Sequence, residues 1–501
     1  MAERKHKLVS FPEKSAPKQE PGRADRDKED RDQADGDDEG RDKDARNEER
    51  SGRAEEVDDH PHPLKKEVEA ELERRWEKSK PLRITAIVSI IIVASWIIIA
   101  LFSPVLRYKL AQAPKAPITS EPFRRELQAL TQSRFADGVS IEPLPNGEQF
   151  YPAEINAIKG AQKNVNIEAY IFERGDVTKQ VVEALTERAR AGVQVRMVVD
   201  AMGSFSTPKR YFKELQNAGG KVAFYHPLRW NTWMRSNNRT HREMTIVDGK
   251  IGFIGGAGFA DHWLEDKEKH LRWRDTMFRV QGEAVTAMQG TFVENWLESS
   301  GELLSGDEFF PMLGKPGNAI TFLIASSPSQ GGSTRGRILF QTMLASAKQS
   351  LDITTPYFLP DDSLQHALIE ARKRGVRVRI LLPGQKSDHL MTRASSRRTY
   401  GDLLLAGVQI SEYQPAMIHA KIMIVDGVWS IVGSTNFDNR SFGINDEVNL
   451  AALDPQMAAT LTHQFEQDLS SAKQVNYDEW KKRPLWERAV EWAGWVLERQ
   501  Q

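Results

Sequence analysis

The chain contains no cysteine among its 501 residues, which excludes disulfide bonds, thiolate metal sites and cysteine nucleophiles. It also has no excess of charge, because 69 lysines and arginines balance 70 aspartates and glutamates. That balance excludes a uniformly basic protein that binds nucleic acid through its whole surface. Since a domain takes roughly 100–200 residues, the length predicts two to four folded units.

Large apolar side chains are missing from a segment near the N-terminus. Residues 23–59 contain 26 charged residues and no Ile, Leu, Met, Phe, Trp or Tyr. Such a segment cannot bury enough apolar surface to offset the entropy lost on ordering. We therefore expect residues 1–63 to form a disordered charged tail.

Charge is missing from a second segment. Residues 84–102 read ITAIVSIIIVASWIIIALF, without a charged residue, glycine or proline. About 20 apolar residues cross the hydrocarbon core of a bilayer, so we expect a transmembrane helix over residues 83–104. A juxtamembrane helix over residues 64–82 would precede it, and Pro81 should end that helix. A cleaved signal peptide is the alternative, but the long charged leader argues against it.

Basic residues are more frequent before this span than after it. Seven lysines and arginines lie between residues 65 and 83, and three lie between residues 107 and 115. The positive-inside rule predicts a single-pass protein of the inner (cytoplasmic) membrane, with its N-terminus in the cytoplasm and its main body on the outer, periplasmic side. Residues 105–137, which include prolines, are expected to be a linker that spaces this body from the bilayer.

From about residue 138 short apolar strands alternate with helical patterns, and the order occurs twice. Residues 184–200 and 367–383 share seven of 17 positions, and residues 241–256 and 419–434 share six of 16. The offsets of 183 and 178 residues indicate a duplicated domain rather than a solenoid. We predict an α/β fold of two α/β/α halves, residues 138–315 and 316–475, related by a pseudo-two-fold axis.

Each half places a histidine immediately before an apolar strand that ends in Asp-Gly. These are His241 with Asp248 in the first half, and His419 with Lys421 and Asp426 in the second. Residues two apart on a strand share a face, so His419 and Lys421 point the same way. An imidazole beside a fixed cation suits a phosphate ester, because the cation offsets charge on the phosphoryl oxygens. Two such units facing each other would supply one nucleophilic and one acidic histidine.

The motif HxKxxxxD followed by GSxN, in residues 419–436, resembles the phospholipase D superfamily. Further segments are most similar to bacterial cardiolipin synthases: PNGEQFYPAEINAIKGA (145–161), Trp273-Arg274-Asp275, TTPYFLPDD (354–362) and GSTNFDNRSFGINDEVN (433–449). The likeness covers about residues 140–472. It implies two repeated phospholipase D-like halves, a reaction without metal or cofactor, and a covalent intermediate that lets a second alcohol replace the first.

The resemblance also implies roles for individual residues. His241 would attack phosphorus to give a phosphohistidine, while His419 would protonate the leaving alcohol and deprotonate the acceptor. Glu447 would orient a catalytic histidine, with Asp275 as its first-half counterpart. The residues expected to bind phosphate are Lys421, Ser434 and Asn436, and those expected to complete the two motifs as catalytic residues are Asp248 and Asp426.

The first half departs from the family pattern. Glu243 stands where a lysine is expected, and Gly258 stands where the second half has Asn436. A carboxylate facing a phosphate costs several kcal/mol at an effective dielectric constant of about 20. We expect Arg239, two residues before His241, to supply the missing cation and bind substrate. The alternative is that Glu243 pairs with a neighbouring base and the second-half lysine alone binds phosphate.

Three surface features suggest contact with lipid, and each has an ordinary alternative. Trp230 and Trp233 lie among arginines just before the first histidine. This segment is either a site where lipid enters the active site or an ordinary surface loop. Arginines 393, 397 and 398 fit anionic headgroups or a solvated helix face. Residues 476–501 predict a C-terminal amphipathic helix that lies on the bilayer or packs on the body.

Three functions are compatible with these residues. The first is a membrane-bound phosphatidyltransferase that converts two phosphatidylglycerol molecules into cardiolipin and glycerol. The second is a phospholipase D-type hydrolase of phospholipid or nucleic acid, and the third is a catalytically weakened lipid-binding protein. We expect anionic phospholipids in the membrane as substrates and do not expect nucleic acid as a partner.

Overall fold

The computed structural model describes residues 63–102, 108–228, 237–264, 272–327, 334–488 and 490–491. The chain separates into a unit of residues 1–83 and a unit of residues 84–501. The expected charged tail lies outside the described residues except for Pro63.

Helix α1 runs from Pro63 to Phe102 and continues through Pro81. The prediction that Pro81 ends a juxtamembrane helix is therefore wrong. The helix continues although proline lacks the amide hydrogen that would donate one backbone hydrogen bond. No helix in the described part of the chain is long and apolar enough to cross a membrane. The transmembrane helix predicted over residues 83–104 is thus not confirmed, and its last two residues lie outside the described ranges.

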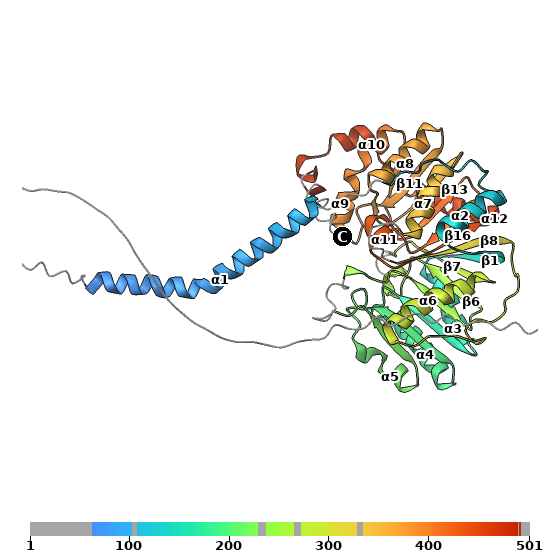
Figure 1. The fold of residues 1–501 in the computed structure, drawn as a ribbon, viewed down its shortest axis with the longest axis horizontal. Coiled ribbons are helices and arrows are strands. Elements are labelled where there is room, and N and C mark those ends of the chain that lie inside the picture. The colour runs from blue at the N-terminus through green and yellow to red at the C-terminus, as the bar shows by residue number, and fades with distance from the viewer. Residues whose placement is uncertain are drawn as a thin grey trace, which may run out of the picture. The chain divides into compact units, whose positions relative to one another are not determined.

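In the described residues fifteen strands form one mixed sheet, whose strand order shows the duplication. From the centre outward the first half contributes β1 (Phe135–Pro145), β7 (Thr276–Gln281), β6 (Ile251–Gly255), β5 (Met244–Val247), β2 (Asn164–Ala169), β3 (Gln194–Asp200) and β4 (Lys221–Tyr225). The second half contributes β8 (Ala319–Ser326), β16 (Glu447–Leu453), β14 (Trp429–Gly433), β13 (Ile422–Val425), β9 (Ser350–Thr354), β11 (Arg377–Pro383), β12 (Gln409–Tyr413) and the edge strand β17 (Ala472–Gln474). β1 and β8 pair antiparallel at the centre, as a pseudo-two-fold axis between equivalent strands requires (Figure 1).

Helices cover both faces of this sheet. Apolar side chains of α6 (Ala284–Ser300) and α12 (Pro455–Ser470) share one core with strands of both halves. On the opposite face α3 (Gly147–Lys159) and α4 (Asp176–Arg190) cover the first half, and α7 (Arg335–Ser346) and α8 (Asp362–Lys373) cover the second. Neighbouring residues of β3 join different cores, Met197 one and Val198 the other, because side chains alternate across a strand. The α/β/α architecture is confirmed.

Shorter elements complete the second half and its surroundings. Strands β10 (Phe358–Leu359) and β15 (Phe437–Asp438) form a separate parallel pair beside the main sheet. Shorter helices are α5 (Lys213–Asn217), α9 (Leu390–Arg398), α10 (Tyr400–Leu405), α11 (Asn439–Gly443) and α13 (Tyr477–Lys481).

Part of the expected linker is folded onto the second half. Helix α2 (Glu121–Thr131) buries Phe123 and Leu127 in the second-half core. The Trp429 indole donates to the Ile118 carbonyl at 2.8 Å. The segment was expected to be a proline-containing linker. Its apolar side chains instead pack into the second-half core. At least residues 118–131 therefore belong to the body.

The C-terminal region is described only to residue 491. Arg483 pairs with the buried Glu491 at 2.6 Å and lies over the Trp480 ring at 3.8 Å. Leu485 and Trp486 are exposed. The rest of the predicted amphipathic helix, residues 492–501, lies outside the described residues.

Candidate active site

The two histidines lie at the centre of the molecule, where the halves exchange backbone hydrogen bonds. His241 stands three residues before β5, and its amide donates to the Asp446 carbonyl of the second half at 2.8 Å. His419 stands three residues before β13, and its amide donates to the Arg274 carbonyl of the first half at 2.7 Å. Each histidine is therefore anchored by the other half, as the duplication predicts for equivalent positions around a two-fold axis.

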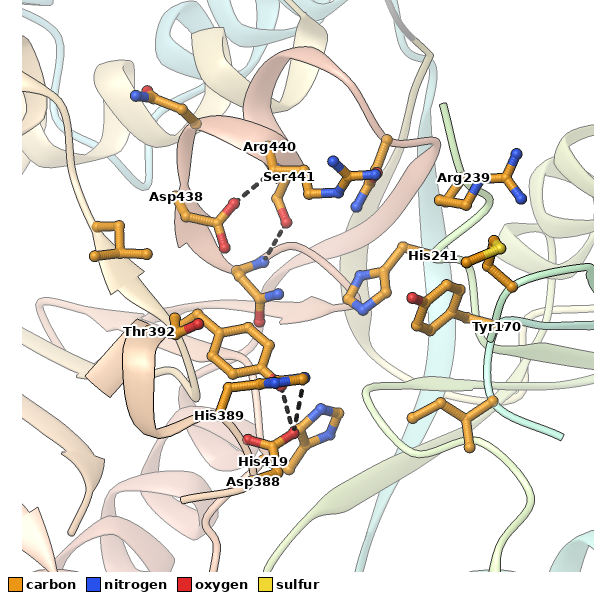
Figure 2. Close-up of a pocket in the computed structure, with 17 residues that line it drawn as sticks. Tyr170, Arg239, His241, Asp388, His389, Thr392, His419, Asp438, Arg440 and Ser441 are labelled. Atoms are coloured by element: carbon orange, nitrogen blue, oxygen red, sulfur yellow. Dashed lines mark hydrogen bonds and ion pairs between the residues drawn. The ribbon is translucent and has the colours of Figure 1, made fainter. Parts of the chain in front are cut away.

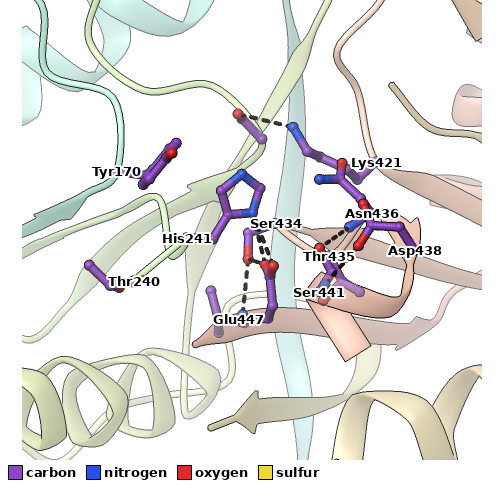
Figure 3. A network of polar contacts seen from close by, with 12 residues as sticks. Tyr170, Thr240, His241, Lys421, Ser434, Thr435, Asn436, Asp438, Ser441 and Glu447 are labelled. Carbon is purple, nitrogen blue, oxygen red and sulfur yellow. Dashed lines mark hydrogen bonds and ion pairs between the residues drawn. The ribbon is translucent and has the colours of Figure 1, made fainter. Parts of the chain in front are cut away.

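A buried carboxylate from the opposite half contacts each imidazole. His241 Nδ1 lies 3.1 Å from both carboxylate oxygens of Glu447, at the start of β16. His419 Nδ1 lies 3.1 Å from Oδ2 of Asp275, which immediately precedes β7. A carboxylate only accepts hydrogen bonds, so Nδ1 of each imidazole is the donor and Nε2 points away from the carboxylate, with Nε2 of His419 lying 3.0 Å from the Lys421 ammonium. The structure thus brings together the two histidines expected to act in catalysis and the two carboxylates expected to orient them (Figure 3 shows the His241 pair).

A cavity of about 410 Å³ is lined by both histidines. Figure 2 shows His241 and His419 facing it from opposite sides, with Arg239 and Arg440 toward His241, and Asp388 and His389 beside His419. One space is thus open to two imidazoles, as a two-step transfer at a single phosphorus requires.

Lys421 shares the His419 end of this arrangement. Its ammonium lies 2.9 and 3.0 Å from the two ring nitrogens of His419 and 3.4 Å from the Gly256 carbonyl oxygen. Burial lowers the pKa of Lys421 to about 8. Burial, together with the Lys421 charge, lowers the pKa of His419 to about 4. His419 is therefore a neutral base at pH 7, and an arriving phosphate anion would raise both pKa values.

Ser434 and Asn436 are both expected to bind phosphate, but their side chains have different hydrogen-bond partners. The Ser434 hydroxyl donates to Glu447 Oε2 and accepts from the Val448 amide at 3.1 Å, so it holds the carboxylate that orients His241. Asn436 lines the cavity, and its buried Oδ1 has no hydrogen-bond partner among the described residues. A buried acceptor without a partner is unfavourable, so Asn436 is suited to a substrate hydroxyl.

Glu243 is accommodated by the backbone rather than by a base. Its Oε1 accepts from the amides of Tyr170 at 3.2 Å and Ile171 at 3.0 Å. Burial raises the pKa of Glu243 well above its usual range, which favours the neutral form and weakens the repulsion of a phosphate. A Cβ at Gly258 would lie 2.8 Å from this oxygen and 2.4 Å from the Ile171 carbonyl oxygen, which excludes an asparagine there. The two departures from the family pattern are coupled.

Arg239 lines the cavity, but its guanidinium is engaged elsewhere. Nη2 donates to the His226 carbonyl at 2.9 Å, and Nη1 lies 3.4 Å from the Asp200 carboxylate. In Figure 2 the guanidinium points away from His241. Arg440, which we did not single out from the sequence, lines the same side and donates to Asn237 at 3.0 Å through Nη1.

The aspartates that end the two motifs are not brought to the histidines. Asp248 accepts from the amides of residues 162–164 at 2.7–3.1 Å, and Asp426 accepts from those of residues 348–350 at 2.7–3.1 Å. Each has a positive φ, 53° and 52°, and with the following glycine makes the tight turn of a hairpin. A strand rises about 3.3 Å per residue, so each lies roughly 20 Å along the chain from its histidine.

Several cavity residues were missed by sequence reasoning. Tyr170 lies 5.1 Å from the His241 ring and Tyr357 lies 6.4 Å from the His419 ring, measured between centroids. Tyr357 and Arg440 fall in segments that carried the family likeness, which was the available signal. Asp388 and His389 follow the β11 strand and carried none.

The lipid-contact expectations have mixed outcomes. Arg393 and Arg397 both bind the Glu412 carboxylate, at 3.1 and 2.9 Å, so they contact a protein carboxylate. Trp230 and Trp233 lie outside the described residues.

In the described ranges, no group of three or more His, Cys, Asp or Glu side chains is arranged to hold a metal ion.

Comparison with known proteins gives a consistent result. A family model described as "Cardiolipin synthase, PLD-like domain" matches residues 155–296 and 340–469. The chain is 35% identical over 367 residues to the major cardiolipin synthase of Bacillus subtilis, covering 72% of this chain and 76% of that protein. It is 34% identical over 351 residues to cardiolipin synthase 2 of Bacillus cereus, covering 70% and 68%. The crystal structure of a phosphatidylserine synthase from Haemophilus influenzae shares the fold, with a TM-score of 0.58 at 15% identity, over 76% of this chain and all of that one.

Proposed function

We propose that this chain, which belongs to the cardiolipin synthase family of phospholipase D-like enzymes, joins two phosphatidylglycerol molecules into cardiolipin and releases glycerol. The single observation that carries this proposal is the pair of histidines facing one cavity, each held by a carboxylate of the other half. Transfer between two alcohols needs one nucleophile and one acid–base group on opposite sides of phosphorus.

The proposed reaction has two displacements. His419 first takes a proton from solvent as the bound phosphate anion raises its pKa. Nε2 of His241 attacks the phosphorus of the first phosphatidylglycerol, the bond from phosphorus to the glycerol oxygen breaks, and His419 donates that proton to the departing glycerol. A hydroxyl of the second phosphatidylglycerol then gives its proton to His419 and attacks phosphorus, and the bond from phosphorus to His241 breaks. Lys421 and the Asn436 side chain support the phosphoryl group and its ligands in both steps.

We test this proposal by lipid mass spectrometry on a host that lacks its own cardiolipin synthases. The wild-type chain should restore cardiolipin, whereas His241→Ala and His419→Ala at equal protein levels should not. Phosphatidic acid without cardiolipin would assign the hydrolase instead. Equal lipid profiles in all three strains would indicate a protein without this activity.

We also propose that α1 attaches the enzyme to the membrane in which its substrates lie. Seven apolar side chains between Ile84 and Val93 are 48–66% exposed. Apolar surface of this extent is stabilised by lipid. Flotation of wild-type protein with vesicles, and its loss in an Ile87→Lys and Ile91→Lys double variant, tests the attachment. Protease accessibility of the two termini in whole cells then distinguishes a helix that crosses from one that lies on the surface.

A further inference from the structure

Asp388 is an acidic side chain in a cavity whose substrate is an anion. It lines the cavity and lies on the His419 side, whereas Arg239 and Arg440 lie on the side of His241 (Figure 2). Its side chain is 19% exposed. A carboxylate repels a phosphate, so this end of the cavity favours a neutral group that donates hydrogen bonds.

The Asp388 carboxylate is held in place by its neighbours. The Tyr357 hydroxyl donates to Oδ2 at 2.6 Å, and the exposed His389 ring lies 3.7 Å from the same oxygen. Tyr357 also faces the His419 ring, so one side chain links the carboxylate to the catalytic base. The hydrogen bond and the ion pair seen for this carboxylate in the described residues are both made by Oδ2, which leaves Oδ1 available to a ligand hydroxyl.

Among the described residues, the equivalent strand of the first half ends in a carboxylate that is engaged differently. There the strand β3 ends in Asp200, whose carboxylate is used by the Arg239 guanidinium and by backbone amides. The two ends of the cavity are therefore chemically different, although the histidines are related by the duplication. Such asymmetry allows one end to take the phosphoryl group and the other to take an alcohol.

We propose that Asp388, positioned by Tyr357, binds a hydroxyl of a glycerol group and thereby selects a vicinal diol as the alcohol. This inference rests on the proposed function. While Asp388 holds one hydroxyl, the adjacent hydroxyl gives its proton to His419 and its oxygen bonds to phosphorus, and the bond from phosphorus to His241 breaks. The diol belongs either to free glycerol or to the headgroup of phosphatidylglycerol.

The first arm of the test measures choice between free alcohols. Purified full-length protein receives cardiolipin as donor with equal concentrations of deuterated glycerol and 1-propanol. The ratio of deuterated phosphatidylglycerol to phosphatidylpropanol is independent of the fraction of folded enzyme. We expect wild-type protein to favour glycerol, Asp388→Asn to lower the ratio about tenfold, and Tyr357→Phe to lower it about threefold. The exposed Asp402→Asn in α10 is the matched control and should leave the ratio unchanged.

The second arm uses phosphatidylglycerol vesicles without added alcohol and measures the ratio of cardiolipin to phosphatidic acid. A fall in both arms with Asp388→Asn supports a site for the lipid headgroup, and a fall in the first arm alone supports a site for free glycerol. Unchanged ratios in both arms, or rates that fall equally for glycerol, propanol and water, would overturn the inference. Failure of the proposed function is separate, because wild-type protein would then form neither cardiolipin nor alcohol adducts.

Discussion

His241 and Glu447 are 206 residues apart in the chain, yet the imidazole Nδ1 lies 3.1 Å from both oxygens of the carboxylate. The equivalent pair, His419 and Asp275, crosses between the halves in the other direction. Neither half therefore contains a complete acid–base pair, and the site requires both copies in one chain.

Removing the negative charge beside either histidine should slow catalysis. We expect Glu447→Gln and Asp275→Asn each to reduce kcat by about 10²–10⁴-fold, because the imidazole loses its tautomer and its orientation. Initial rates of cardiolipin formation with folded protein measure this effect. A reduction below threefold in both variants would contradict it, and the exposed Asp402→Asn serves as control.

The turn aspartates should affect stability. Asp248→Ala and Asp426→Ala each leave three backbone amides without their acceptor, so we expect each to cost about 1–3 kcal/mol and to lower the Tm. Thermal unfolding measures the loss. Turnover is compared per folded molecule. A reduction of turnover by more than tenfold in either variant would support the catalytic role that the family likeness implies.

Glu243 should be replaceable by glutamine but not by the lysine of the family pattern. Glutamine offers the same acceptor to the amides of Tyr170 and Ile171, so we expect Glu243→Gln to keep activity within about threefold. Glu243→Lys puts a donor against two donors and a second cation near Lys421, and should reduce folded yield. Soluble expression and cardiolipin formation are the measurements. Equal activity of the lysine variant would show that the local backbone can rearrange.

The pH dependence of kcat/KM should have an alkaline limit set by Lys421. Lys421, with a pKa of about 8, loses its charge as the pH rises through 8, so kcat/KM should fall above this pH. Lys421→Arg should move the alkaline limit upward, and an alkaline limit that stays at pH 8 in this variant would assign it to another group.

Arg440 should contribute more to substrate binding than Arg239. The Arg239 guanidinium already contacts Asp200 and the His226 carbonyl. In the described residues, the Arg440 guanidinium donates hydrogen bonds only to Asn237. We expect Arg440→Gln to raise the KM for phosphatidylglycerol about tenfold, with kcat nearly unchanged. Arg440→Lys is the charge-conserving control. A larger KM effect from Arg239→Gln would instead support Arg239 as the replacement cation.

Local patterns in the sequence predicted much of the fold. The repeated segments 184–200 and 367–383, where helical patterns alternate with apolar strands, each contain the end of a helix and a strand, α4 with β3 and α8 with β11. Apolar periodicity and glycine stops are properties of neighbouring residues, and the repeat added the two-fold relation. The same reasoning read residues 118–131 as linker, because it could not detect that their apolar side chains have a partner far along the chain.

The sequence by itself determined the duplication and the two histidines, and its resemblance to a known family implied their partner carboxylates. Only the tertiary structure decided which carboxylate contacts which histidine, that Ser434 holds Glu447, and that Asp248 and Asp426 bind backbone amides. It also placed Asp388 beside His419 in the cavity. The reason is physical: a motif records which groups a chain carries, whereas hydrogen bonds between residues on different strands and turns depend on how the strands of the sheet are ordered.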